Sequence, residues 1–228
     1  MLEAYGPQGW WPLVNASTGE SEYRGTVTGS DRECLEIAVG AILTQSVSWK
    51  NVEKAVTGLK CNGFLEPRRL IEIPLDQLAL MIRSTGYYNQ KALKIREFLT
   101  WLKGHNYSFS DLRQMNTPDL RAELLSVRGI GPETADSILL YALGKQVFVV
   151  DAYTRRIFTR IGFLKGKEKY TEIQMLFHEC IQADVKTYRE YHALIVEHAK
   201  EACRKTPVCD KCVIRDRCSY YTGNLLQS

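Results

Sequence analysis

Residues 124 to 151 constrain the fold of this 228-residue chain more than any other segment. They read LLSVRGIGPETADSILLYALGKQVFVVD, which is the pattern of a helix, a glycine turn, a second helix and an apolar run ending in a carboxylate. The glycines of the turn Arg128-Gly129-Ile130-Gly131 allow positive φ and leave no Cβ between an anion and the backbone N–H groups. Pro132 suits the first position of the second helix, whose positive end would face the same anion. The segment therefore predicts a phosphate-binding turn followed by one carboxylate, Asp151.

Composition and periodicity favour an all-α protein. The chain is 45% hydrophobic, which is enough to bury a core. Apolar residues recur at helical spacing from Asp31 to Lys60. Periodicity or start signals predict further helices over 75–84, 89–103, 117–127, 132–143, 152–162, 171–182 and 185–203. The β-like run 146–150 is too short and isolated to make a sheet.

The sequence also indicates where the protein acts. It contains no run of 18 apolar residues, and its N-terminus lacks a basic-then-apolar signal pattern. We therefore expect a soluble, intracellular protein without a membrane partner. The net charge of +4 permits a polyanionic partner but is too small to demonstrate one.

Four of the seven cysteines are clustered near the C-terminus, and they predict a metal centre. They are Cys203, Cys209, Cys212 and Cys218. Zinc in an all-cysteine site usually draws on two separated C-x2-C pairs, whereas one C-x2-C flanked on both sides better suits a compact [4Fe-4S] cluster. We expect iron–sulfur, with zinc as the alternative, and we expect the scattered Cys34, Cys61 and Cys180 to be core residues.

Two basic residues, Arg204 and Lys205, lie between the first two clustered cysteines. Taken singly, each fits a solvated polar tail. If the four cysteines bind a rigid metal cluster, Arg204 and Lys205 would instead form a loop that contacts phosphate groups.

The hairpin, the second helix and Asp151, in this order and spacing, resemble the helix-hairpin-helix and Gly/Pro-Asp (HhH-GPD) signature of the endonuclease III superfamily of DNA glycosylases. The blocks WWP, LTQ, GYYNQKA and VVD are most similar to its 3-methyladenine DNA glycosylase III branch. The cysteine tail instead looks like endonuclease III, although its first gap is one residue shorter than the usual six. The resemblance implies a monomer that binds double-stranded DNA containing a damaged base, in the cytoplasm and associated with the nucleoid.

The same resemblance implies two helical domains flanking a DNA cleft. Residues 31–146 would form a six-helix barrel with the helix-hairpin-helix. Residues 1–30 and 147–228 would form a helical iron–sulfur cluster domain, with Asp151 at the mouth of the cleft.

Asp151 matches the catalytic aspartate of the superfamily. Cleavage of an N-glycosidic bond passes through an oxocarbenium-like sugar, which a fixed carboxylate stabilises, and the carboxylate can also activate water. Its alternative role, compatible with the first, is to cap the helix 152–162. Glu133 occupies the position where bifunctional members carry a lysine, and a carboxylate cannot form an imine. We therefore expect a monofunctional glycosylase with weak or absent strand cleavage; a neighbouring lysine such as Lys145 could substitute, but it lies a full helix away.

The resemblance also implies how the base is extruded and held. Gln45 matches the residue that fills the gap left by a flipped nucleotide, and Tyr87 lies in the segment carrying the opposing wedge. Trp10, Trp11 and Trp49 are candidates for a pocket, because indole faces attract cationic alkylated purines. The expected substrate is an alkylated purine such as 3-methyladenine. Oxidised pyrimidines or mismatched bases, cut by a glycosylase with AP lyase activity, and a non-catalytic DNA-binding module are the alternatives.

Overall fold

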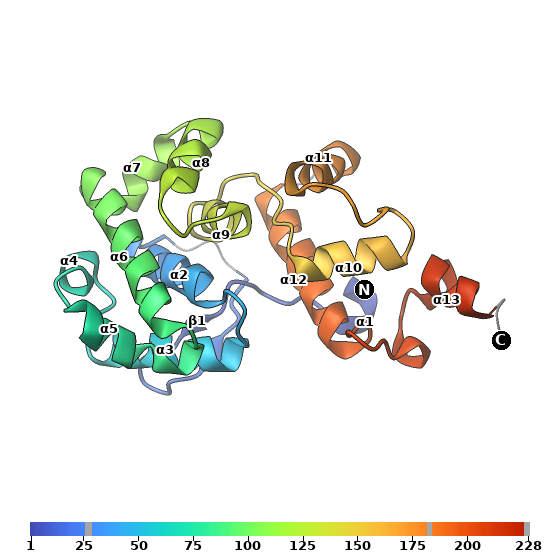
Figure 1. Cartoon of the computed structure of the whole chain (residues 1–228), viewed down its shortest axis with the longest axis horizontal. Coiled ribbons are helices and arrows are strands. Elements are labelled where there is room, and N and C mark those ends of the chain that lie inside the picture. The colour runs from blue at the N-terminus through green and yellow to red at the C-terminus, as the bar shows by residue number, and fades with distance from the viewer. Residues whose placement is uncertain (26–28, 182–183, 226–228) are drawn as a thin grey trace. The chain divides into compact units, whose positions relative to one another are not determined.

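The computed structural model describes residues 1–25, 29–181 and 184–225 (Figure 1). Its regular structure in these ranges is helical apart from one antiparallel pair of two-residue strands, β1 (Leu13–Val14) and β2 (Ser21–Glu22), which confirms the all-α prediction. No helix in these ranges is both long and apolar enough to cross a bilayer. The chain divides into two compact units: the hairpin unit, residues 11–145, and the cysteine unit, residues 1–10 with 146–228.

The hairpin unit is built around one buried helix, α2 (Asp31–Leu43), in which every residue from Cys34 to Leu43 is buried. Ser30 caps its N-terminus, accepting a hydrogen bond from the Glu33 backbone N–H. Helix α2 packs against α3, α6, α7, α9 and η2. The other helical elements of the unit are α3 (Trp49–Cys61), α4 (Pro67–Leu70), α5 (Leu75–Met81), η1 (Arg83–Thr85), α6 (Tyr88–Gly104), α7 (Phe109–Gln114), α8 (Thr117–Ser126), α9 (Pro132–Ser137) and the π-helical turn η2 (Ile138–Ala142).

The helical periodicity predicted across Asp31 to Lys60 resolves into two helices with a break between them. Helix α2 ends at Leu43, capped by Thr44, and α3 begins at Trp49. Ser46, within the break, has φ +56°, a left-handed conformation that no continuous helix can contain. Gln45 therefore lies in a connection between helices, not inside an apolar helix.

The residues from Trp11 to Ser30 were assigned from the sequence to the cluster domain, but those that the structure describes belong to the hairpin unit. The reason is a buried ionic contact. Glu36 of α2 accepts hydrogen bonds from the Val14 N–H (2.6 Å) and from Lys60 Nζ (2.6 Å), and Lys60 also donates to the Val14 carbonyl. These bonds attach β1 to α2 and α3.

The cysteine unit is built on the long helix α12 (Val185–Glu201), against which α1 (Leu2–Tyr5) and α10 (Ala152–Arg160) pack. Its remaining elements are α11 (Tyr170–Cys180), η3 (Cys209–Lys211), η4 (Arg215–Arg217) and α13 (Ser219–Leu225). The helix predicted over 171–182 corresponds to α11, and its expected end at Gln182 lies outside the described residues. Phe148 and Phe177 stack at 3.9 Å in the core of the unit.

The apolar run 146–150 is extended, but it pairs with side chains instead of a strand. The Phe148 N–H donates to His178 Nε2 (3.0 Å), and the Phe148 carbonyl accepts from Gln174 Nε2 (2.7 Å). The Val150 N–H donates to Tyr170 Oη (3.3 Å). Three residues of α11 thus satisfy backbone groups that would be costly to bury unpaired, and they fix the approach to Asp151.

The prediction that all three scattered cysteines are core residues is wrong for two of them. Cys34 is buried in α2, but Cys61 and Cys180 are exposed. Each of these two is the last residue of its helix, α3 and α11, where the chain turns to the surface.

Candidate functional site

The two glycines of the turn between α8 and α9 differ: the space where a Cβ would stand is open at Gly131 but is filled by the Lys94 side chain at Gly129. Gly129 has φ +90°, whereas Gly131 has φ −93° and serves as the N-cap of α9. The positive φ expected from the sequence is therefore used only at Gly129. Arg128, Gly129 and Gly131 are exposed, while Ile130 is buried at 5% exposure and fixes the turn to the core.

A partly buried ion pair holds the two helices of the hairpin together. Arg121 of α8 donates from Nε and Nη2 to the two carboxylate oxygens of Asp136 on α9, at 2.7 and 3.0 Å. Asp136 is fully buried. Such a bidentate pair restrains both distance and orientation, so the turn is presented on a rigid support.

Gln45 is hydrogen-bonded to this turn. Its Nε2 donates to the Gly129 carbonyl (3.3 Å) and to Thr134 Oγ1 (3.0 Å), and its Oε1 accepts a hydrogen bond from Lys94 Nζ on α6. A Cβ at Gly129 would lie 2.4 Å from Lys94 Cγ. The amide side chain predicted to replace a flipped nucleotide is thus tied to the turn predicted to bind the backbone.

Tyr87 and the buried Lys91 lie at the N-terminal end of α6. Tyr87 has φ +46° and is 74% exposed, an unusual placement for a large aromatic residue. Lys91 Nζ donates to the carbonyls of Leu43 (2.9 Å) and Thr85 (2.7 Å), which precede Gln45 and Tyr87 by two residues each. Desolvation, with a smaller effect of Lys94, lowers the pKa of Lys91 to about 8. One buried amine therefore fixes the backbone before both predicted DNA-inserting residues.

Asp151 lies at the N-terminus of α10 and is 9% exposed. Its Oδ1 accepts hydrogen bonds from the Thr154 N–H (2.6 Å) and from Thr154 Oγ1 (2.8 Å), so it is an N-cap, as the sequence allowed. Burial alone would raise the pKa of Asp151, but His192 and Thr154 together outweigh it, and the pKa is lowered. The side chain is therefore an oriented anion at neutral pH.

His192 is a residue of this site that the sequence reading missed. Its Nε2 lies 3.7 Å from Asp151 Oδ2, the carboxylate oxygen that Thr154 does not contact. Trp10 packs its ring edge-on against the His192 imidazole (5.9 Å), and Lys200 Nζ lies 5.5 Å from the centre of the Trp10 ring. The pairing of residues 151 and 192 has no local signature in the sequence, although a histidine on an otherwise apolar helical face is a visible, weak signal.

Glu133 is exposed in the first turn of α9, where the helix dipole favours an acid. Lys145, the lysine considered as a substitute, donates from Nζ to the carbonyls of Arg113 and Met115, both at 2.7 Å. Desolvation lowers the pKa of Lys145. Its amine is committed to a structural role at the end of the hairpin unit.

The three tryptophans proposed for a pocket fall in two different units. Trp11 and Trp49, both half-buried in the hairpin unit, meet edge to face at 5.6 Å. Trp11 also contacts Tyr141 (5.2 Å), and Trp49 Nε1 donates to Ser21 Oγ (3.0 Å). Trp10 belongs to the cysteine unit.

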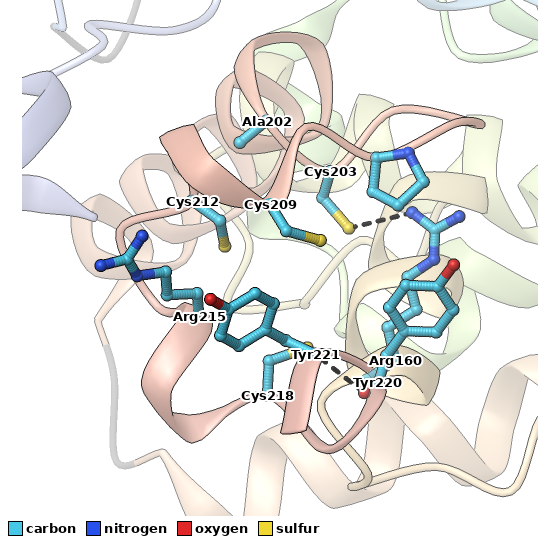
Figure 2. A pocket seen from close by; sticks show the side chains of 10 residues that line it. Arg160, Ala202, Cys203, Cys209, Cys212, Arg215, Cys218, Tyr220 and Tyr221 are labelled. Carbon is cyan, nitrogen blue, oxygen red and sulfur yellow. Dashed lines mark hydrogen bonds between the residues drawn. The ribbon is translucent and has the colours of Figure 1, made fainter. Parts of the chain in front are cut away.

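The four clustered cysteines line one pocket, together with Arg160, Ala202, Pro207, Arg215, Tyr220 and Tyr221 (Figure 2). It holds about 270 Å³ not filled by protein atoms, part of it open to solvent. Burial, together with repulsion from neighbouring thiolates, raises the pKa of Cys209 and of Cys212. In the described part of the chain, no three His, Cys, Asp or Glu side chains converge closely enough to hold a single metal ion. The thiols surround a space instead of meeting at a point.

Arg160, a second residue that the sequence reading missed, organises this pocket. Its Nη1 donates to Cys203 Sγ (3.3 Å) and to the Arg204 carbonyl (2.7 Å), and its Nη2 donates to the Lys205 carbonyl (2.8 Å). Arg204 and Lys205 are exposed, and Arg204 Nε donates to the Lys200 carbonyl (2.6 Å). The loop between the first two cysteines is thus held by its backbone while both basic side chains remain at the surface.

Comparison with known proteins supports the resemblance stated above. Residues 39–183 match the family described as HhH-GPD superfamily base excision DNA repair protein. A protein of Methanocaldococcus jannaschii named as a DNA repair glycosylase is 44% identical over 96% of this chain and 92% of its own length. Endonuclease III of Sulfolobus acidocaldarius is 29% identical over 87% of each chain.

Solved structures show the same fold. The 3-methyladenine DNA glycosylase MagIII of H. pylori, bound to 1,N6-ethenoadenine, is 31% identical with a TM-score of 0.64, over 72% of this chain and 84% of that one. A non-covalent complex of endonuclease III with DNA is 22% identical with a TM-score of 0.72, over 89% of each chain. With the hairpin, the capped aspartate and the cysteine tail in place, the chain belongs to the HhH-GPD superfamily of base excision DNA repair proteins.

Proposed function

We propose that this protein is a monofunctional DNA glycosylase that hydrolyses the N-glycosidic bond of a flipped, alkylated purine in double-stranded DNA. The observation that carries the proposal is a pair of carboxylates: Asp151 is buried, oriented and ionised, while Glu133 stands where a bifunctional enzyme would need an amine. The first can stabilise a cationic sugar, and the second cannot form a Schiff base.

Asp151 supports the hydrolytic step through its fixed geometry. Thr154 holds Oδ1 with two hydrogen bonds, and His192 faces Oδ2, so the carboxylate cannot rotate freely. A charge that is already oriented stabilises the oxocarbenium-like transition state without a reorganisation cost. The same carboxylate would accept a proton from the attacking water.

The hairpin turn and its neighbours support binding of duplex DNA. The exposed Arg128 and the open space at Gly131, at the N-terminus of α9, suit one phosphate. Gln45 and the exposed Tyr87 would fill the space of the extruded nucleotide. Arg204 and Lys205 would add a second contact to the sugar-phosphate backbone.

Trp11 and Trp49 are the candidates for the base pocket within the hairpin unit. A purine methylated on a ring nitrogen, such as 3-methyladenine in DNA, carries a positive charge, which indole faces attract, and its glycosidic bond is already labile. The 31% identity to MagIII, a 3-methyladenine DNA glycosylase, supports this substrate class. The curated relatives named endonuclease III favour the second candidate, an oxidised pyrimidine.

We propose that Cys203, Cys209, Cys212 and Cys218 hold a [4Fe-4S] cluster. The four thiols line one common pocket, and a single C-x2-C pair flanked by a cysteine on each side suits a cube with one thiolate at each iron better than a single zinc ion. Bound there, the cluster would supply structural cross-linking and a redox-active centre. Arg160 would offset part of its negative charge at Cys203.

The decisive experiment is a panel of duplexes, each carrying one damaged base, with base release measured by chromatography. Asp151→Asn should reduce release from the preferred lesion by about 100-fold or more. Asp184→Asn is the matched control, because Asp184 caps α12 through Thr187 with the same geometry (2.7 Å) and lies in the same unit. Release from none of the substrates would refute the enzymatic function, and preference for oxidised pyrimidines would replace the proposed substrate.

Borohydride trapping tests the monofunctional assignment. The wild-type protein should give no efficient covalent adduct with damaged DNA, whereas Glu133→Lys should gain one, because it places an amine where the sugar aldehyde reacts. Efficient trapping of the wild-type protein would contradict the assignment.

A further inference from the structure

The N-terminal helix α1 contacts the cysteine pocket through one buried histidine. Tyr5, the last residue of α1, has its hydroxyl 2.8 Å from His198 Nδ1. The other ring nitrogen, His198 Nε2, lies 3.6 Å from Cys212 Sγ. His198 is fully buried, and the two rings pack with centroids 5.9 Å apart. A continuous line of polar contacts thus joins residue 5 to a thiol more than two hundred positions later.

The direction of these hydrogen bonds follows from the chemistry of a cluster ligand. A cysteine bound to iron is a thiolate, so its sulfur has no proton and can only accept. His198 Nε2 must therefore carry the hydrogen that it shares with Cys212. In a neutral imidazole the remaining nitrogen, Nδ1, is then an acceptor, and the Tyr5 hydroxyl must donate to it. Tyr5 selects the tautomer that presents an N–H to the sulfur.

We propose that Tyr5 and His198 are a positioning pair that donates a hydrogen bond to the Cys212 thiolate and raises the reduction potential of the cluster. The proposal rests on the [4Fe-4S] centre proposed above. Reduction adds negative charge to the cluster and its sulfur ligands, and a hydrogen-bond donor at the sulfur stabilises that charge. The ring is desolvated, which strengthens the interaction relative to one in water.

Arg160 provides a contrast within the same pocket. It donates to Cys203 (3.3 Å), but it also holds two loop carbonyls and packs over the Tyr220 ring. Its removal would disturb the loop as well as the sulfur. The hydrogen bond from His198 to Cys212 can instead be weakened by removing the Tyr5 hydroxyl, which contacts His198 and not a cysteine. A change in reduction potential can then be distinguished from loss of the cluster.

The test uses the full-length protein purified with its iron intact, and it measures the reduction potential by a redox titration monitored by electron paramagnetic resonance. Tyr5→Phe keeps the aromatic packing and removes the hydroxyl, and it should shift the potential to more negative values. His198→Leu should give a larger shift in the same direction. His198→Gln restores a side-chain N–H and should recover part of the wild-type potential. Tyr188→Phe is the matched control: it removes a tyrosine hydroxyl of the same unit that donates to the Ile181 carbonyl (3.3 Å), Tyr188 does not line the pocket, and the potential should stay unchanged.

Iron and sulfide content separate failure of this proposal from failure of the cofactor assignment. Wild-type potentials in both Tyr5→Phe and His198→Leu at full iron loading would overturn the positioning role alone. Should His198→Leu fail to assemble, Tyr5→Phe, which changes no atom near the cysteines, decides the question by itself. A colourless wild-type protein containing zinc would overturn the cluster and this proposal together.

Discussion

The hairpin turn offers a sharp test, because two glycines separated by one residue meet different physical demands. Gly129 has φ +90°, and a Cβ there would lie 2.4 Å from Lys94 Cγ and 2.9 Å from Lys94 Cδ. Gly131 has φ −93°, and a Cβ there would meet no atom within 4 Å. The same substitution, glycine to serine, can therefore be made at both positions. We expect Gly129→Ser to destabilise the protein and Gly131→Ser to be tolerated.

The magnitude follows from two separate costs. Holding a serine in the left-handed region costs about 1–3 kcal/mol. The Lys94 stem must also move, which breaks its hydrogen bond to Gln45, and a net contribution of about 1 kcal/mol is typical of such a bond. Gly129→Ser should thus lower the free energy of unfolding by about 2–4 kcal/mol. Serine is a good N-cap, so Gly131→Ser should change it by less than about 0.5 kcal/mol.

Urea denaturation measures both free energies, and fluorescence anisotropy with an undamaged duplex measures the effect on binding. Gly129→Ser should also weaken binding, because Gln45 loses the lysine that orients it against the turn. If the two variants unfold at the same urea concentration, the strain and the Lys94 contact do not have the importance that we assign to them. Equal affinity of Gly129→Ser and the wild type would remove the turn from the DNA interface.

Three further predictions concern the buried lysine, the tryptophans and the cysteines. Burial lowers the pKa of Lys91 to about 8 from 10.5, so between these pH values unfolding takes up a proton. The free energy of unfolding of the wild type should therefore rise across this pH range relative to that of Lys91→Met. If the free energies of unfolding of the two proteins depend on pH in the same way, the shift is contradicted. Trp49→Ala should weaken selection for an alkylated purine by about 1–3 kcal/mol, measured as relative kcat/KM on alkylated and oxidised substrates, and an unchanged ratio would exclude base stacking on Trp49. Cys209→Ala should abolish the visible absorbance of an iron–sulfur cluster and lower the melting temperature; retained absorbance would exclude Cys209 as a ligand.

The sequence alone specified the features that depend on a few neighbouring residues. Ser30 and Asp151 each cap a helix through the residue three positions later, which is a local bond. The glycine turn, the spacing of the cysteines and the carboxylate at position 133 are equally local. Hydrophobic periodicity likewise predicted most of the helices, because one turn of a helix spans only 3.6 residues.

Other features required the folded chain. The break at Gln45 followed no strong stop signal. The described residues between 11 and 30 belong to the hairpin unit, where Glu36 and Lys60 hold Val14, and hydrophobic periodicity does not reveal such contacts. The extended run 146–150 has the composition of a strand, yet its backbone groups are satisfied by side chains of α11. Local propensity cannot anticipate such partners.

The division has one physical cause. Short-range hydrogen bonds and periodic patterns are fixed by chain geometry, so they can be recognised from residue types in order. His192 beside Asp151, Arg160 beside Cys203 and Tyr5 beside His198 join residues 41 to 193 positions apart. Their proximity depends on how whole helices pack, and only the tertiary structure decides which polar side chain meets which functional group.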